Sequence, residues 1–114
     1  MTDDDKKIVS EFKQAVNMTP QQLEKWLDSE ESKKVGFKEN DKDESVGHKS
    51  GKLILEISGK KQSDYTEDDL KHIHKVVGYI KRHSAQRPEG DITETNWRYS
   101  LMNWGHDPKV QGGN

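Results

Sequence analysis

Residues 65–88, YTEDDLKHIHKVVGYIKRHSAQRP, carry the strongest helix pattern in the chain. Thr66 is suited to cap the helix, and the three acidic residues that follow it occupy the first turn, where the helix dipole favours negative charge. Beyond them, apolar side chains recur at the three- and four-residue spacing of one helix face. They are Leu70, Ile73, Val77 and Ile80. Because Arg87-Pro88 stops the helix, we expect it to run from Thr66 to about Ala85 as the central element of the domain.

Three further helices are predicted before this one. The first follows an apolar stripe over residues 8–16, and the second covers residues 19–27. Thr19 and Gln22 form a capping box for the second helix, which gives it a defined start. The third follows a turn at residues 45–47 and ends near residue 59, with its apolar residues on one face.

A last helix is predicted near the C-terminus. It opens at Asp91 or Thr93, and the better capping box is Asp91 with Glu94. Gly105 suits a helix end and Pro108 forbids continuation. The sequence therefore predicts an all-α fold of about five helices.

Length and composition indicate one domain. The chain has 114 residues, of which 28% are hydrophobic and 35% are charged. Such a chain can build a single core of modest size. We expect the helical domain over residues 6–108, with a mobile acidic loop at 33–44, a disordered tip at 1–5 and a disordered tail at 109–114.

Several classes of protein are disfavoured by composition. The chain has no cysteine, so disulfides, thiolate nucleophiles and cysteine-based metal sites are excluded. It has no apolar run long enough for a membrane helix, and its acidic start does not resemble a signal peptide. We therefore expect an intracellular protein with no membrane partner, located in the cytoplasm, or in the nucleus in a eukaryotic cell.

The net charge of −2 conceals an uneven distribution along the chain. Residues 1–45 carry twelve acidic side chains against eight lysines, whereas residues 46–114 carry nine against eleven basic ones. The stretch 70–88 contains five basic residues and no acidic residue. An acid-free basic run in an otherwise acidic protein suggests a polyanionic partner.

The basic run predicts a nucleic-acid contact. Its candidate residues are Lys71, Lys75, Lys81, Arg82 and Arg87, with Lys49, Lys52 and Arg98 as secondary contacts. On a helix, Lys71, Lys75 and Arg82 share one face that points away from the apolar stripe. Such a ridge would bind phosphates of the backbone, of DNA in the first instance, with little base specificity. The competing interpretation is that these side chains merely solvate an exposed helix face.

No metal or cofactor is expected. His72 and His74 point about 200° apart on a helix, and His72 and His83 are separated by about 16 Å of helical rise. Neither pair can hold one ion. Residues 47–52 resemble a phosphate-binding loop but lack its glycine spacing and its Ser or Thr after the lysine.

Two other functional classes remain open. The segment Trp97–Trp104 is rich in aromatic residues, which we expect to close the core against Trp26. An exposed part of this helix would instead form a protein-interaction or homodimer surface. An enzyme is not expected, because a site at His106 and Asp107 would need a pocket that a small helical domain has little room to form.

Several segments resemble a known family of small proteins. They are residues 15–19, 45–51, 75–83, 85–88 and 97–108. The family is known only as a domain of unknown function, and some of its bacterial and fungal members carry the label DNA-binding protein. The resemblance covers about Phe12 to Lys109, with departures at 38–44 and at Ser84. It implies a DNA-binding role but supplies no active-site or ligand residues.

Overall fold

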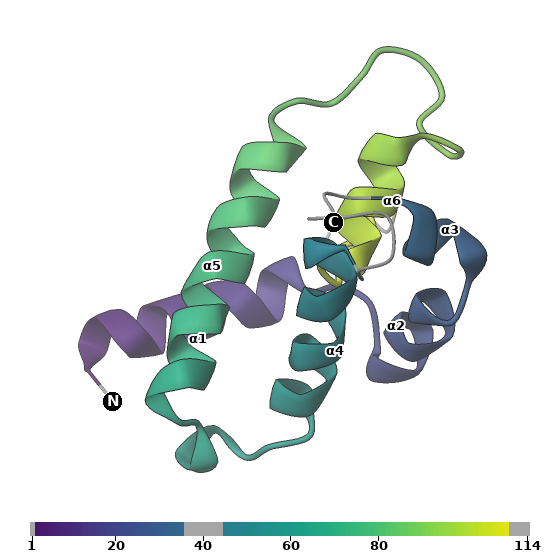
Figure 1. Ribbon diagram of the computed structural model, residues 1–114. Helices are drawn as coiled ribbons and strands as arrows, with labels where there is room; N and C mark the ends of the chain where they lie inside the picture. The colour runs from purple at the N-terminus through teal and green to yellow at the C-terminus, as the bar shows by residue number, and fades with distance from the viewer. Residues whose placement is uncertain (1, 36–44, 110–114) are drawn as a thin grey trace.

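The computed structural model describes residues 2–35 and 45–109, and over these ranges it is all-helical, with no strand. It forms one globule (Figure 1), which confirms the predicted fold class. The described ranges hold six α-helices and one 3-10 turn. They are α1 (Asp3–Ala15), α2 (Pro20–Leu27), α3 (Glu30–Lys34), α4 (Val46–Ser58), η1 (Gln62–Asp64), α5 (Glu67–Ser84) and α6 (Asn96–Asn103).

Helix starts are set by side-chain caps. In α5 the Thr66 hydroxyl accepts from Asp69 N at 3.1 Å, and the Asp69 carboxylate accepts from Thr66 N at 3.0 Å. The predicted box at Thr19 is also present and starts α2. A third box joins Thr2 and Asp5, so α1 begins at Asp3. The predicted disordered tip was therefore wrong for residues 2–5, because the acidic residues there occupy a capped first turn.

Two predicted boundaries near the C-terminus were also wrong. Helix α6 begins at Asn96 with Thr95 as its cap, not at Asp91 or Thr93. The Asp91 carboxylate instead accepts from the backbone N and the hydroxyl of Thr93, which makes a local turn. The predicted disordered tail starts too early, because Lys109 Nζ donates to Thr93 Oγ1 at 2.6 Å. Residues 110–114 lie outside the described residues.

Helix α3 lies partly inside the predicted acidic loop 33–44, since it includes residues 33 and 34. Its position is fixed by a buried amide on α6. Asn103 Oδ1 accepts from Trp26 Nε1 at 2.8 Å and also from the Ser32 hydroxyl, while Asn103 Nδ2 donates to Ser32 O at 3.2 Å. Because these groups are buried and satisfied together, a polar segment is held as a helix. The rest of the predicted loop, residues 36–44, lies outside the described residues.

Helix α5 is the central element, as predicted. Helix α1 crosses it on one side, and α4 lies beside it with opposite chain direction (Figure 1). Helices α2, α3 and α6 pack together beyond α4. The α5 side chains Ile73, Val76, Val77 and Ile80 are all buried in one core shared with α1, α2, α4 and α6. None of the described helices is long and apolar enough to cross a membrane.

Candidate functional site

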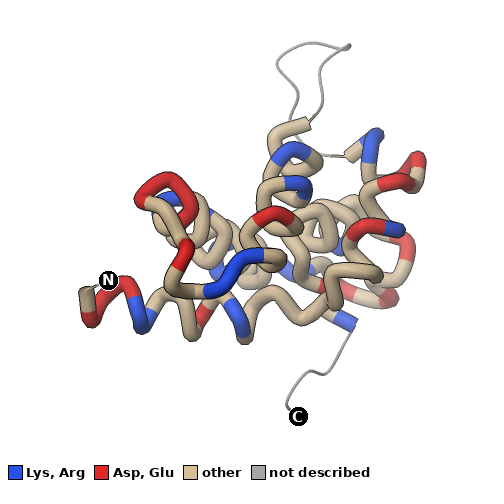
Figure 2. The backbone as a smooth tube through the Cα atoms, turned by 90° about the horizontal axis from the view of Figure 1, so that it is seen from below, with Lys and Arg blue, Asp and Glu red and all other residues tan. Residues whose placement is uncertain are grey.

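The basic residues of α5 divide between two sides of the helix. On the α1 side, Lys81 Nζ pairs with Glu11 Oε1 at 3.2 Å, and His74 Nε2 lies 3.8 Å from Asp5 Oδ1. Acidic and basic positions are interspersed along much of the chain (Figure 2). Lys81, which was predicted as a nucleic-acid contact, is thus paired with a carboxylate of α1 and lies apart from the other side of α5, and its contact with nucleic acid stays a prediction.

The other side of α5 faces a groove between α4 and α5. Lys71 and Lys75 line a cleft of about 290 Å³ together with Leu53 and Ile57 of α4. Lys75 and Arg82 line a second cleft, of about 260 Å³, at the N-terminal end of α4. Since the two clefts share Lys75, we treat them as one α4–α5 groove. Three of the predicted residues, Lys71, Lys75 and Arg82, thus lie in one row along it.

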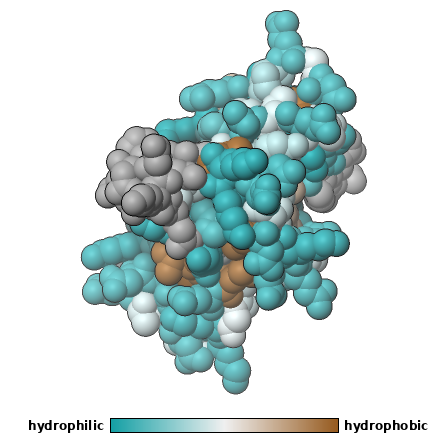
Figure 3. Space-filling view, turned by 45° about the vertical axis from the view of Figure 1, so that its right-hand side comes forward, coloured by the Kyte–Doolittle hydropathy of each residue, from teal (hydrophilic) through white to brown (hydrophobic). Residues whose placement is uncertain are grey.

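Helix α4 forms the opposite rim of this groove. In the part of the chain that the structure describes, Val46 and Leu53 are the exposed large hydrophobic residues, at 36% and 44% of their surface. Lys49 lies between them by helical spacing and is exposed, as is Lys52. The view in Figure 3 shows a largely hydrophilic face with small hydrophobic areas between the polar side chains. The predicted secondary contacts on α4 therefore lie on the helix that borders the α5 row.

The groove is acidic at its lower end, which lies at the N-terminal end of α5. Asp68 and Asp69 line the cleft near Lys71. Asp69 is engaged by Lys60, whose Nζ lies 2.8 Å from Oδ2, and this bond is the chief reason that the pKa of Asp69 is lowered. The basic row is therefore bounded at this end, and its positive part extends from Lys71 towards Arg82.

The remaining two predicted basic residues are engaged elsewhere. Arg98 donates from Nε and Nη2 to the two carboxylate oxygens of Asp107, at 3.0 and 2.9 Å, and from Nη1 to Thr93 O at 2.9 Å. This bidentate pair is partly buried and uses the whole guanidinium fork. Arg87 lies over the ring of Trp97, 5.8 Å from its centroid, beyond the end of α5. The donors of Arg98 thus hold the C-terminal segment, and its predicted role as a secondary phosphate contact stays a prediction.

His106 and Asp107 close the fold at the same place. His106 Nδ1 is 2.7 Å from Ala15 O, and Asn17 exchanges two hydrogen bonds with the backbone of Asp107. Burial raises the pKa of Asp107, but the hydrogen bonds from Arg98 and from the backbone of Lys109, together with the charge of Arg98, hold the pKa below its usual value. These contacts join the end of α6 to the turn between α1 and α2. Their observed role is structural.

Helix α6 and the residue that follows it contribute to the core, where Leu101 and Trp104 are buried at 0% and 3% exposure. The segment packs in the core as expected, but only in part against Trp26: Tyr99 lies 5.2 Å from Trp26 between ring centroids, whereas Trp97 and Trp104 stack with rings of α5. Five rings interleave from the two helices in the order Trp97, His83, Tyr79, Trp104, His72, with successive centroids 6.3, 5.1, 4.2 and 6.2 Å apart. On the other side of α6, Met102 borders a cleft of about 410 Å³ with Met18 and Trp26 of the α2 region.

Three histidines have structural contacts in the core. His48 is buried, with Nε2 2.9 Å from Leu27 O. His72 Nε2 is 2.9 Å from the Ser50 hydroxyl, and burial lowers the pKa of His72. Burial also lowers the pKa of His83, whose Nε2 is buried without a hydrogen-bond partner among the described residues. Across residues 2–35 and 45–109, no group of three or more His, Asp or Glu side chains is placed to hold a metal ion.

Some groove residues were missed from the sequence. Tyr79 lies between Lys75 and Arg82 in the same helical row. With Trp104 it lines the cleft of about 260 Å³ at the N-terminal end of α4, here called the upper cleft. Its spacing of four and three residues from the two cations could have revealed it. The contribution of Val46 and Gly47 could not be predicted, because it depends on how α4 is placed against α5 and α6.

Fold and groove together define a small helical protein with a basic groove between two antiparallel helices. Residues 11–102 match the model of the family described as "Protein of unknown function (DUF3140)". The chain belongs to this family. No curated protein and no solved structure matches it.

Proposed function

We propose that the protein binds nucleic acid, DNA in the first instance, through phosphate contacts along the α4–α5 groove. Lys71, Lys75 and Arg82 form the contact row, and Lys49 and Lys52 supplement it from the opposite helix. The observation that carries the proposal is the one-sided placement of these cations. The carboxylates of α1 engage Lys81 and approach His74, on the other side of α5.

The row has the dimensions of a short backbone contact. Lys71 and Arg82 are eleven residues apart, which corresponds to about 16 Å along a helix. A site that neutralises about four phosphates would lose roughly a hundredfold in affinity between 50 and 200 mM salt, because bound counterions are released from the nucleic acid. Phosphate contacts carry no sequence information, so little base preference is expected.

A charge-reversal pair tests the groove directly. The double variant Lys75→Glu, Arg82→Glu should lower the affinity for labelled DNA at least about tenfold at 50 mM salt, measured by fluorescence anisotropy. The control is Lys6→Glu, Lys7→Glu, which reverses the same number of charges at exposed positions of α1. The control should bind within about twofold of the unchanged protein. Lys6 and Lys7 lie outside the groove, so their reversal affects DNA binding only through the net charge of the protein.

Two outcomes would contradict the proposal. One is the absence of any binding at the lower salt concentration. The other is an equal loss in both double variants, which would assign the attraction to overall charge and not to the groove. Circular dichroism of each variant checks that the helical fold is retained.

A further inference from the structure

We propose that the upper cleft of the groove receives one nucleotide unit, a phosphate with its unstacked base, and so makes the protein select single-stranded over duplex nucleic acid. This inference rests on the proposed function and specifies the form of nucleic acid bound. Eight of the residues that the structure describes line this cleft, here called the nucleotide pocket. They are Val46, Gly47, Lys75, Tyr79, Arg82, Ser100, Asn103 and Trp104.

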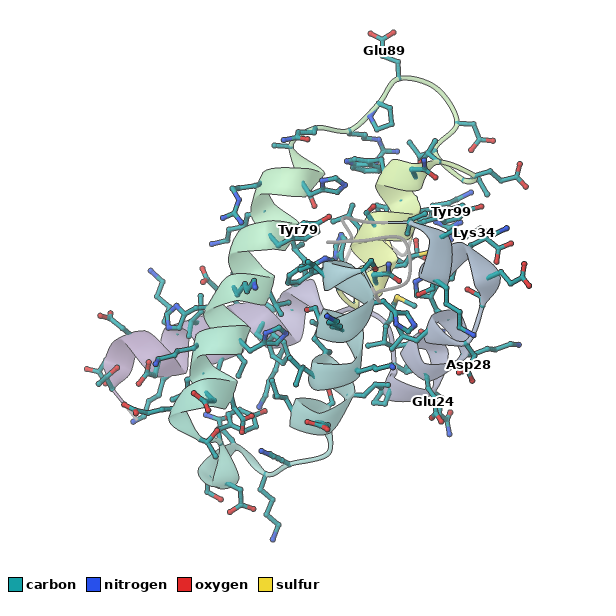
Figure 4. All side chains as sticks on the ribbon, in the orientation of Figure 1. Glu24, Asp28, Lys34, Tyr79, Glu89 and Tyr99 are labelled. Carbon is teal, nitrogen blue, oxygen red and sulfur yellow. The ribbon has the colours of Figure 1, made fainter. Side chains whose placement is uncertain are left out.

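The charge of the nucleotide pocket favours an anion. Among the residues that the structure describes, its lining includes two cations, Lys75 and Arg82, and no carboxylate. Both cations are exposed and stand two helical turns apart on α5, with Tyr79 between them on the side of α5 that faces α4 and α6 (Figure 4). A phosphate at the mouth can therefore reach a cation on either side of the ring.

Backbone donors add to this preference. Val46 and Gly47 are the first residues of α4, where N–H groups have no acceptor within the helix. The cap residue Ser45 accepts from His48 N at 3.1 Å, one position further on. The N-terminal end of a long helix is favourable for an anion, and here it opens on the same cleft as the two cations.

An independent observation comes from Trp104, whose indole is buried at 3% exposure. Its Nε1–H donates to no acceptor among the residues the structure describes. A Cβ built on Gly47 would lie 3.0 Å from this nitrogen, so Nε1 faces the wall that Gly47 forms. An indole N–H that has no acceptor in the protein can donate to an acceptor atom of a bound base.

The size and lining of the pocket favour one flat ring. Its volume of about 260 Å³ is smaller than most sites for drug-sized ligands. Tyr79 and Trp104, stacked with centroids 4.2 Å apart, supply apolar surface at its floor. The bases of a duplex are paired and stacked inside the helix, so only an unpaired nucleotide can enter.

The test compares strand forms at one salt concentration. A labelled oligothymidylate should bind at least about tenfold more tightly than its duplex with oligoadenylate. Val46→Phe fills the mouth of the pocket without changing charge, and it should bring the two affinities within about twofold by weakening only the single strand. Leu53→Phe is the matched control, an exposed apolar residue of the same helix in the lower cleft, and it should keep the preference.

Competition with small probes distinguishes the pocket from the groove. Thymidine monophosphate should displace the single strand at lower concentration than either thymidine or inorganic phosphate, because the pocket takes both parts of the nucleotide. Equal binding of both strand forms, unaffected by Val46→Phe, would overturn this inference and leave the proposed function standing. Binding of the mononucleotide without binding of any oligonucleotide would support the pocket and contradict the proposed function. No binding of any probe would overturn both.

Discussion

Gly51 illustrates how a single residue sets the distance between two helices. It is buried in α4, and a Cβ at this position would lie 2.6 Å from Asn103 O and 2.7 Å from Leu27 Cδ2. Helix propensity alone would favour alanine here by about 1 kcal/mol. The contact with the α6 backbone makes glycine the favoured residue instead, because α4 would have to move away from α6 to admit a methyl group.

We therefore expect Gly51→Ala to lower the free energy of unfolding by about 1–3 kcal/mol, despite the gain in helix propensity. Gly59→Ala is the control, since a Cβ there would meet its nearest atom, Glu56 O, at 3.6 Å, an ordinary contact. Urea unfolding followed by circular dichroism measures both variants. A Gly51→Ala protein as stable as the control would show that α4 and α6 are not in close contact.

At the scale of the elements, α3 depends on a side chain of another helix. Five residues are too few to form a stable helix alone. Ser29 caps it, and Asn103 on α6 binds Ser32 from inside the core. The structure of this segment is therefore a tertiary property that its own polar sequence does not specify.

Asn103→Ala should leave Trp26 Nε1 and the Ser32 hydroxyl without their acceptor and cost about 2 kcal/mol or more. Hydrogen exchange should report faster exchange in α3 than in α5, because only α3 loses its anchor. Asn96→Ala, at an exposed position on the same helix, is the matched control and should leave both rates unchanged. Unchanged protection of α3 in Asn103→Ala would contradict this account.

At the scale of the whole molecule, the ring stack that joins α5 to α6 makes stability depend on pH. Burial lowers the pKa of His72 and of His83, so the folded protein holds both rings neutral to a lower pH than the unfolded chain does. The pKa of histidine in the unfolded chain is about 6.5. Below this pH the unfolded state binds more protons than the folded state does, so the free energy of unfolding decreases as the pH is lowered. The lowered pKa of Asp5, Asp69 and Asp107 acts separately, near pH 4 and below.

The melting temperature should therefore be lower at pH 5.5 than at pH 7.5, and His83→Phe should reduce this difference. The phenyl ring keeps the stack with Tyr79 and Trp97 but removes the titrating nitrogen. His74→Gln, at an exposed position near Asp5, is the control and should retain the full difference. Thermal melts of the three proteins at both pH values decide the point, and an unchanged difference in His83→Phe would refute it.

The charge pattern is also a property of the whole molecule. Five basic residues lie in a stretch of sequence without acidic residues, but in the fold they have different surroundings. Lys71, Lys75 and Arg82 line the groove. Lys81 pairs with a carboxylate of α1, and Arg87 lies over the ring of Trp97. The basic surface is thus a narrow row bordered by α4, and not a broad patch.

Features that depend on neighbours along the chain could be predicted from the amino-acid pattern. Capping boxes at Thr19 and Thr66 and the apolar spacing of α5 act within a few residues, so the all-α class and the central helix could be predicted. Other features follow from the packing of the helices: the pairing of Lys81 with a carboxylate, the direction of the Arg98 guanidinium, and the helical structure of α3. The same packing determines which groups line the nucleotide pocket. These outcomes depend on contacts between residues that are far apart in the chain, as Lys81 is from Glu11 and Ser32 is from Asn103, and no local pattern records such contacts.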